Sequence, residues 1–235
     1  MNSFPVFNSF SKRGIIVTCS KLWGQWRRKG TLQFMDNLVR LKNRYYILRH
    51  GKSEANETGI ILSNPDEGTT ACGLTEEGKE QVRKSVQEAR KKELLDSSTI
   101  IYSSDFVRCR ETAEIVQNIL GCDTSHYTVA LRERFFGTWE KTHQSNYQKV
   151  WDNDSKNPEH KINEVESIAE VLKRTTTLIF ELEEKYQGLS ILLISHGDVL
   201  QILQTAFENS SPSMHRQLQQ LANAEIRKLV VNKYG

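Results

Sequence analysis

A short apolar run that ends in Arg-His-Gly most constrains how this chain folds. Residues 45–48 are two tyrosines, an isoleucine and a leucine, and Arg49-His50-Gly51 follows at once. Aromatic and β-branched residues in a short run favour a buried strand, and the abrupt change in chemistry predicts a loop at its end. Ligands of open α/β sheets bind beyond the carboxyl ends of the strands, so this loop is where we expect a functional site.

The rest of the chain alternates between short apolar segments and longer segments with helical periodicity. Further strands are predicted over residues 99–103, 127–131, 190–194 and 226–231. Helices are predicted over residues 75–92, 104–120, 164–186 and 198–207. This alternation predicts an α/β fold in which a mostly parallel central sheet is the middle of three α/β/α layers.

The expected helix starts and the connecting segments complete this outline. Thr75, Ser104 or Asp105, and Asp198 are the predicted N-caps, since short polar side chains bind the free N–H groups of a first turn. Gly78 inside the first long helix implies a close approach by a neighbouring backbone. Residues 51–73 are predicted to be a polar loop. Residues 141–163 are predicted to be an insertion or lid with Tyr147 and Trp151 as aromatic anchors.

Charge divides the chain at about residue 44. Residues 1–44 hold nine lysines or arginines and a single acid, Asp36, a balance of +8. Because the whole chain carries +3, residues 45–235 carry −5, which disfavours a nucleic-acid partner for that part. We expect a single domain over residues 45–235, preceded by a basic extension over residues 1–44.

The extension has two readings, which the sequence leaves open. Acid-poor segments that contain arginine and serine resemble organellar transit peptides, and such segments are also typical of disordered tails. No apolar run reaches the length of a membrane span, so no membrane partner is expected. The cysteines (Cys19, Cys72, Cys109 and Cys122) form no CxxC pair, which favours a reducing compartment. The cytoplasm is therefore predicted, with the mitochondrion or plastid as the alternative.

Two predicted strands end in a histidine turn, at His50 and at His196, and others end before Arg108 and Glu133. If these ends share one edge of the sheet, two histidines, two arginines and a carboxylate meet there. Arginine pairs orient a phosphate through charge-assisted hydrogen bonds, and a neutral imidazole can attack phosphorus. Glu133 could protonate a leaving alkoxide if its pKa is raised, while Arg49 and Arg108 should lower the pKa of His50. The pattern indicates phosphoryl transfer.

Six segments, taken in order, resemble the motifs of the histidine phosphatase (phosphoglycerate mutase-like) superfamily. They are Arg49-His50-Gly51 with Ser53 and Asn56, Leu74–Gln81 (LTxxGxxQ), Ser104–Ala113 (SDLxRxxxTA), Leu131–Gly137 (LxERxFG), Ser195-His196-Gly197, and Asn223–Ile226 (NAxI). A single Arg-His-Gly is common by chance, but six ordered motifs over about residues 45–231 are specific. The resemblance implies a phosphoglycerate mutase-like fold and a metal-independent, cofactor-independent enzyme.

The resemblance also implies a role for each matching residue. His50 is the implied phosphoryl acceptor and Glu133 the implied proton donor. The implied phosphate-binding residues are Arg49, Asn56, Arg108 and His196. Two positions depart from the family pattern: Lys52 stands where Glu or Gln is frequent, and Lys141 stands where the acid loop often has glycine. Lys52 either favours an acidic substrate or is simply solvated, and we favour the second interpretation.

Several residues near these motifs have a simpler explanation than catalysis. We expect His126, His143, His160 and His215 to be ordinary core or surface residues. Arg110 and Arg134 are expected to be surface charges or charges behind the site. Trp139 and Trp151 either border the substrate or pack beneath residues 141–163. The histidines and acids lack the spacing of metal ligands, so no metal site is predicted.

The sequence therefore predicts a phosphatase that hydrolyses a phosphate monoester through a phosphohistidine on His50. A phosphoglycerate mutase with the same centre is the alternative, although residues 134–195 are short for a mutase insertion. A catalytically silent protein that binds a phosphorylated ligand is the third hypothesis. The expected partner is a small-molecule phosphate ester, whose identity the sequence leaves open along with the oligomeric state.

Overall fold

A computed structural model describes residues 41–232 of the chain. Most of the predicted basic extension, residues 1–40, lies outside this range, and so does the choice between a tail and a transit peptide. Within residues 41–232, none of the helices has the length and apolar character needed to cross a membrane.

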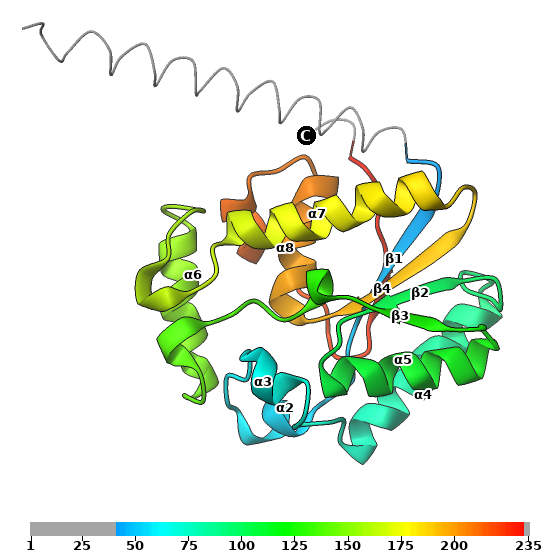
Figure 1. Cartoon of the computed structure of the whole chain (residues 1–235), viewed down its shortest axis with the longest axis horizontal. Helices are drawn as coiled ribbons and strands as arrows, with labels where there is room; N and C mark the ends of the chain where they lie inside the picture. The colour runs from blue at the N-terminus through cyan, green and yellow to red at the C-terminus, as the bar shows by residue number, and fades with distance from the viewer. Residues whose placement is uncertain (1–40, 233–235) are drawn as a thin grey trace, which may run out of the picture. The chain divides into compact units, whose positions relative to one another are not determined.

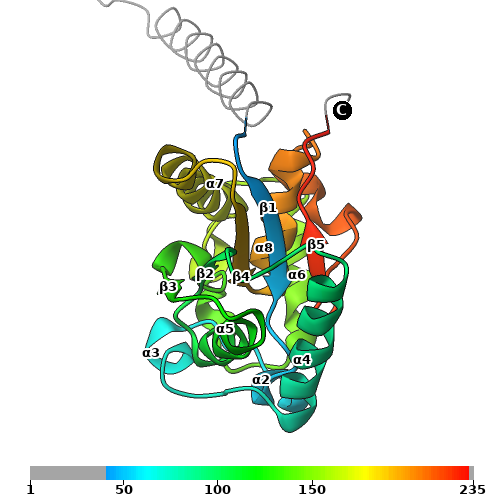
Figure 2. The ribbon, with the colours of Figure 1, turned by 90° about the vertical axis from the view of Figure 1, so that its right-hand side faces the viewer.

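The described residues form a five-stranded sheet in the order β3-β2-β4-β1-β5. The strands are β1 (Arg44–Arg49), β2 (Ile100–Ser103), β3 (Ser125–Tyr127), β4 (Ser190–Ser195) and β5 (Ile226–Lys228). All pairings are parallel except that of β5, which runs antiparallel to β1 at the edge of the sheet. Figure 2 shows β1 lying between β4 and β5. The predicted α/β class with a mostly parallel sheet is confirmed.

Helices cover both faces of this sheet. The α-helices are α2 (Glu54–Thr58), α3 (Pro65–Gly68), α4 (Glu76–Lys91), α5 (Val107–Leu120), α6 (Tyr147–Asp154), α7 (Ile168–Lys185) and α8 (Gly197–Phe207). Short 3-10 helices are η1 (Val129–Leu131), η2 (Gly137–Trp139), η3 (Gln144–Asn146), η4 (Ile162–Glu164) and η5 (Pro212–Gln217). In Figure 1, α4 and α5 lie together on one face of the sheet, and α7 and α8 lie on the other.

The alternation of side chains along the strands explains this layering. Leu192 and Ile194 of β4 belong to the same apolar core as Val82 of α4 and Ala113 of α5. Tyr45, on the opposite face of β1, donates its hydroxyl to the carbonyl of Ile179 in α7. Because both faces are covered, β4 is buried at every position, which accounts for its continuous apolar run.

Two of the helix-start predictions were wrong. Thr75 does cap α4, where its hydroxyl accepts a hydrogen bond from Gly78 N at 3.0 Å. However, Phe106 and not Ser104 or Asp105 is the N-cap of α5, and His196 and not Asp198 is the N-cap of α8. The displaced polar side chains have tertiary partners instead, which the sequence does not reveal.

Boundaries also differ in the connecting segments. The polar loop predicted over 51–73 contains α2, begun by a capping box between Ser53 and Asn56, and α3, begun by Asn64. The strand predicted over 127–131 ends at Tyr127, and residues 129–131 form η1 instead. These elements are too short for a periodic pattern to identify.

Two positions explain features of the sequence that have no local reason. A Cβ atom on Gly78 would overlap the carbonyl oxygen of Lys52, so the approach inferred from this mid-helix glycine is confirmed. Lys141 has a φ of 61°, in the left-handed region that favours glycine. That conformation accounts for the glycine that the family often has at this position.

Candidate active site

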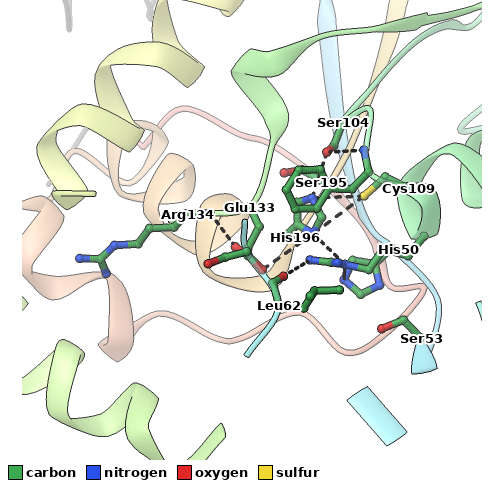
Figure 3. A network of polar contacts seen from close by, with 12 residues as sticks. His50, Ser53, Leu62, Ser104, Cys109, Glu133, Arg134, Ser195 and His196 are labelled. Carbon is green, nitrogen blue, oxygen red and sulfur yellow. Dashed lines mark hydrogen bonds and ion pairs between the residues drawn. The ribbon is translucent and has the colours of Figure 1, made fainter. Parts of the chain in front are cut away.

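The two predicted histidines lie side by side at the carboxyl ends of adjacent strands. Arg49 and Ser195 are register partners in β1 and β4, so His50 and His196 leave the sheet at the same level. Their ring centroids are 5.2 Å apart at an interplanar angle of 64°. His50 is 3% exposed and His196 is fully buried. Figure 3 shows the two rings close to Glu133 and Ser104.

Arg108 connects the two imidazoles. It lies in the first turn of α5, which follows β2, and its guanidinium is almost fully buried. Its Nε lies 3.2 Å from both His50 Nε2 and His196 Nδ1, and its Nη2 donates to the carbonyl of Leu62 at 3.1 Å. Its Nη1 is buried and has no hydrogen-bond partner among the described residues.

Arg49 presents a second cation to the same place. Its Nη1 donates to the carbonyl of Leu221 at 2.9 Å, which holds the side chain in position. Its Nε is also buried without a partner among residues 41–232. A Cβ atom on Gly197 would lie 3.2 Å from this Nε, so the glycine of the second histidine turn leaves room for the guanidinium. Two arginines that each have a buried donor without a partner among the described residues suit a phosphate dianion.

The hydrogen bonds define which nitrogen of His50 is free to react. Nδ1 lies 2.7 Å from the carbonyl oxygen of Gly51, and because a carbonyl can only accept, Nδ1 carries the proton. Nε2 therefore has its lone pair directed at the Arg108 side. Burial lowers the pKa of His50 well below its usual range, and the charges of Arg108 and Arg49 lower it further. These shifts favour the neutral imidazole, which is the form that can act as a nucleophile.

His196 has the opposite tautomer. Since Nδ1 accepts from Arg108 Nε, the proton is on Nε2, which lies 3.0 Å from the Ser104 hydroxyl. Burial, followed by the charge of Arg108, keeps the pKa of His196 well below its usual range. Ser104 thus orients this ring and does not serve as the predicted cap of α5.

Glu133 completes the group. One carboxylate oxygen accepts from the Arg134 N–H at 3.0 Å, and the other lies 3.8 Å from His196 Nδ1. Burial raises the pKa of Glu133 to about 7, with Asp198 adding to the rise and Arg108 opposing it. A carboxyl group with this pKa exchanges a proton near neutral pH, as a general acid must.

Asn56 lies at the rim of the same site. Its side-chain oxygen accepts from Ser53 N at 3.2 Å as part of the α2 capping box, and from Asn223 Nδ2 at 3.2 Å. Asn223 also donates to the carbonyl of His50 at 3.2 Å. Asn56 is therefore connected to the His50 loop, and its role in binding phosphate stays a prediction.

Arg49, His50, Asn56, Arg108 and Glu133 line a cavity of about 420 Å³, and His196 lies behind its wall in contact with Arg108. The wall further includes residues from the segments 57–72 and 135–163, where the sequence predicts it, and four residues from elsewhere: Ile60, Leu62, Phe136, His143, Gln144, Ser145, Tyr147, Trp151, Gly197, Asp198, Arg216 and Gln220. Tyr147 and Trp151 are the predicted aromatic anchors, and both face the cavity from α6. Arg216 and Gln220 belong to a polar stretch without any motif, so nothing in the sequence marks them.

Arg134 was expected to be either a surface charge or a charge behind the site, and it lies behind the site. It is completely buried, and Figure 3 shows its side chain extending away from the two histidines. It forms two hydrogen bonds with Asp154, at 2.6 and 2.8 Å, and one with Asp198 at 3.3 Å. The acids raise the pKa of Arg134 against the effect of burial. The ion pair fixes the segment that carries Glu133 to α6.

The two departures from the family pattern lie away from the cavity wall. Lys52 pairs with Glu77 at 2.7 Å and Glu57 at 3.6 Å, and Lys141 pairs with Glu67 at 2.6 Å. The solvated interpretation of Lys52 agrees with this position. Trp139 packs on the apolar cluster of Phe136 beneath the segment 141–163, whereas Trp151 faces the cavity.

No group of three or more His, Cys, Asp or Glu side chains within residues 41–232 is arranged to hold a metal ion. The remaining histidines have structural contacts. His160 hydrogen-bonds Asp154 at 2.7 Å, and His126 packs on Tyr102 with ring centroids 4.8 Å apart. His143 is the exception, because it lies in the cavity wall.

Comparisons with known proteins agree with this geometry. The family model of the histidine phosphatase superfamily (branch 1) matches residues 45–235. A protein of Escherichia coli O139:H28 named probable phosphoglycerate mutase GpmB is 33% identical over 162 residues, which are 66% of this chain and 70% of that protein. A protein of the same name from Citrobacter koseri is 31% identical over the same shares.

Two solved structures share the fold. A phosphoserine phosphatase from Entamoeba histolytica, in complex with 3-phosphoglyceric acid, has a TM-score of 0.63 at 26% identity and covers 79% of this chain and 89% of its own. A mycobacterial glucosyl-3-phosphoglycerate phosphatase has a TM-score of 0.64 at 21% identity and covers 79% and 91%. The ordered motifs, the fold and the family match lead to one conclusion: the chain belongs to the histidine phosphatase superfamily.

Proposed function

We propose that this protein is a phosphatase that hydrolyses a phosphate monoester through a phosphohistidine on His50. One observation supports this above all others: an unprotonated, buried His50 Nε2 lies beside two arginines that have buried donors without partners among the described residues. A phosphoryl group placed there meets a nucleophile and a double positive charge at once. We further propose that residues 45–235 are the catalytic domain.

In the first step, His50 Nε2 attacks phosphorus, forming an N–P bond while the bond from phosphorus to the ester oxygen breaks. Glu133, which is partly protonated near neutral pH, gives its proton to the departing oxygen, so the product leaves as a neutral alcohol. Arg49 and Arg108 bind the peripheral oxygens, over which the negative charge of the transferring phosphoryl group is spread. His196 donates to the same phosphate from Nδ1, so phosphate binding requires that the proton of this ring is on Nδ1. Asn56 assists from the rim.

In the second step, water attacks the phosphohistidine. Glu133, now ionised, accepts a proton from the water as the N–P bond breaks, which releases inorganic phosphate and restores neutral His50. No metal or organic cofactor takes part in this scheme. Chelators such as EDTA are therefore expected to leave the activity unchanged.

The proposed substrate is a small-molecule phosphate ester. A cavity of about 420 Å³ is at the small end of ligand pockets, which fits a compact molecule. The structural relatives support this class, since one is complexed with 3-phosphoglyceric acid and a mutant of the same enzyme is complexed with phosphoserine.

The absence of a CxxC pair and the free, buried thiols of Cys109 and Cys122 support a reducing compartment, either the cytoplasm or an organelle reached through residues 1–44.

The mutase alternative is supported by the name of the curated relatives. Both reactions begin with a phosphohistidine and differ in whether water or a bound acid accepts the phosphoryl group. Measuring phosphate release and phosphoglycerate isomerisation with one enzyme preparation distinguishes them. Isomerisation that is faster than release would replace hydrolysis as the main activity.

The central experiment is to trap the intermediate. Rapid acid-free quenching after mixing with a ³²P-labelled ester should leave label on wild-type protein in an acid-labile, alkali-stable form. The label should be absent from His50→Ala and present in a surface control, His126→Ala. A wild type that is never labelled, together with a His50→Ala variant that behaves like wild type, would instead favour the silent binding protein.

A further inference from the structure

We infer that Arg216 binds a second anionic group of the substrate, a carboxylate or another phosphate, in the cavity where His50 attacks. The inference rests on the proposed function and narrows its substrate class to compact phosphate esters that carry one more negative charge. It follows from the position, the stacking and the incomplete pairing of this arginine.

The position of Arg216 places a third cation in the cavity wall. Arg216 belongs to η5, between the second histidine turn and the Asn223–Ile226 motif, and lines the same cavity as Arg49 and Arg108. Among the lining residues these three arginines are the permanently charged cations. If Arg49 and Arg108 bind the reacting phosphate, Arg216 is left for another anion.

Stacking fixes the orientation of this guanidinium. Its central carbon lies 3.6 Å from the centroid of the Trp151 ring, and Trp151 in turn stacks on Tyr147 with centroids 5.4 Å apart at 12°. An arginine that rests on the face of an aromatic ring keeps the edge of its guanidinium available for hydrogen bonds, and the donors that Gln201 does not use can bind a carboxylate or phosphate. The stack thus holds a preorganised donor.

The charge of Arg216 is less completely paired than that of its neighbour Arg134. Arg134 makes hydrogen bonds of 2.6 and 2.8 Å with Asp154, whereas the acid that pairs with Arg216 is Asp198, at 3.8 Å. Asp198 already accepts from Arg134 and from the indole N–H of Trp151. The hydrogen bond of Arg216 to a described side chain goes to the neutral amide of Gln201.

The electrostatics of the two arginines agree with this difference. Burial lowers the pKa of Arg216 even though Asp198 and Asp154 oppose it, while the same acids raise the pKa of Arg134. The side chain of Arg216 is 25% exposed, so an incoming anion can reach it. A bound anion would supply the pairing that Asp198 provides only in part.

The wall also holds uncharged polar residues. Gln144, Ser145 and Gln220 are neutral donors and acceptors, and they suit the uncharged parts of a substrate. Arg216 also holds Trp151 in place, so it has a structural role in any case. The test must therefore separate loss of an anion contact from loss of packing.

The test compares substrates within each variant. Phosphoserine carries a carboxylate, fructose 1,6-bisphosphate carries a second phosphate, and p-nitrophenyl phosphate carries neither. We expect Arg216→Gln to lower kcat/KM for the preferred doubly anionic ester about 10- to 100-fold relative to kcat/KM for p-nitrophenyl phosphate, through a rise in KM. Arg216→Lys, which retains charge but loses the fork, should recover part of this ratio.

Lys149→Gln is the matched control. Lys149 also rests on an aromatic ring, 4.8 Å from the centroid of Trp139, but it does not line the cavity. In Lys149→Gln, the ratio of kcat/KM for the doubly anionic ester to kcat/KM for p-nitrophenyl phosphate should equal that of wild type. The melting temperatures of all variants should be compared, to detect any loss of packing. The second anion is a carboxylate if kcat/KM of Arg216→Gln falls more for phosphoserine, and a phosphate if it falls more for fructose 1,6-bisphosphate.

Three outcomes overturn the inference. They are an unchanged ratio in Arg216→Gln, an equal loss on all three substrates, and a wild-type enzyme that prefers p-nitrophenyl phosphate to both doubly anionic esters. In these cases the wild type still hydrolyses phosphate esters, so the proposed function stands. A wild type that hydrolyses none of the three would instead contradict the proposed function itself, and the inference with it.

Discussion

Arg134 and Asp154 form a two-pronged ion pair in which neither side chain has any exposure to solvent. Arg134 adjoins the candidate acid Glu133, and Asp154 ends α6, which supplies the aromatic wall of the cavity. The pair therefore ties the acid to the segment that surrounds the substrate. A network of this kind fixes geometry only while every member is satisfied.

Removing the charge of Asp154 should destabilise the protein strongly. Asp154→Asn removes the closer of the two acids that pair with the buried guanidinium of Arg134, and breaking a buried ion pair costs about 3–5 kcal/mol. The free energy of unfolding in urea measures this. The control is Glu76→Gln, since Glu76 pairs with Lys79 at 2.7 Å but its side chain is 82% exposed, so solvent screens the pair and the loss should be much smaller. Equal losses in the two variants would contradict the structural role of the buried pair.

Arg108→Ala should reduce catalysis more than any other single change in the phosphate-binding group. It removes the donor that contacts both imidazoles and leaves the phosphate one cation short. By analogy with lost oxyanion donors, kcat/KM should fall by about 10²- to 10³-fold. Arg110→Ala serves as control, because Arg110 contacts the carbonyl of Asp105 outside the cavity. Equal kcat/KM values for wild type and Arg108→Ala would remove Arg108 from the site.

The activity should depend on pH through Glu133. The acid must be protonated in the first step, and because its pKa is raised to about 7, kcat/KM should decline as the pH rises above about 7. The free energy of unfolding should also decrease as the pH rises. The folded state binds the Glu133 proton more tightly than the unfolded state does, so the stabilisation that this proton provides is lost as pH rises through about 7. Glu133→Gln should abolish both dependences.

The leaving group provides an independent check on that role. Alkyl phosphates need protonation of the departing oxygen, whereas nitrophenolate departs readily without it. Glu133→Gln should therefore reduce kcat/KM, which reports the first step alone, about 10²- to 10⁴-fold for an alkyl ester and clearly less for p-nitrophenyl phosphate. A uniform reduction for both esters would indicate that Glu133 positions the substrate rather than donating a proton.

Gly78→Ala should destabilise the fold, although alanine normally stabilises a helix interior by about 0.5–1 kcal/mol relative to glycine. A Cβ atom here would overlap the carbonyl of Lys52, in the loop that follows His50, and forced backbone shifts cost about 1–3 kcal/mol. Gln87→Ala, at an exposed position of α4, controls for helix propensity. An increase in the urea midpoint of Gly78→Ala would contradict the close approach.

Lys141→Gly should stabilise the protein by about 1 kcal/mol, because glycine adopts the left-handed φ of 61° without the cost that a side chain incurs. The ion pair with Glu67 that is lost is exposed and contributes little. Lys141→Ala loses the same ion pair but keeps the strain, so it should not be more stable than wild type. Thermal unfolding of the three proteins gives the comparison.

The long elements could be predicted from the sequence because each carries a local signal. The apolar run of β4 and the spacing of Val82, Val86 and Ala89 in α4 reflect burial within one element. The candidate site residues could also be predicted, because each follows a recognisable strand and parallel strands bring their carboxyl ends to one edge of the sheet. The short elements α2, α3 and η1 gave no periodic signal and were missed.

The sequence by itself determined the class of fold, the identity of the residues that meet at its edge and the family to which they belong. The tertiary structure decided which polar side chains have partners across the chain. Asp198, expected as a cap, binds Arg134 and Trp151 instead, and Ser104 orients His196. It also brought Arg216 to the cavity. Local patterns report burial and helix ends, but the partner of a charge is set by which distant segments the fold brings together.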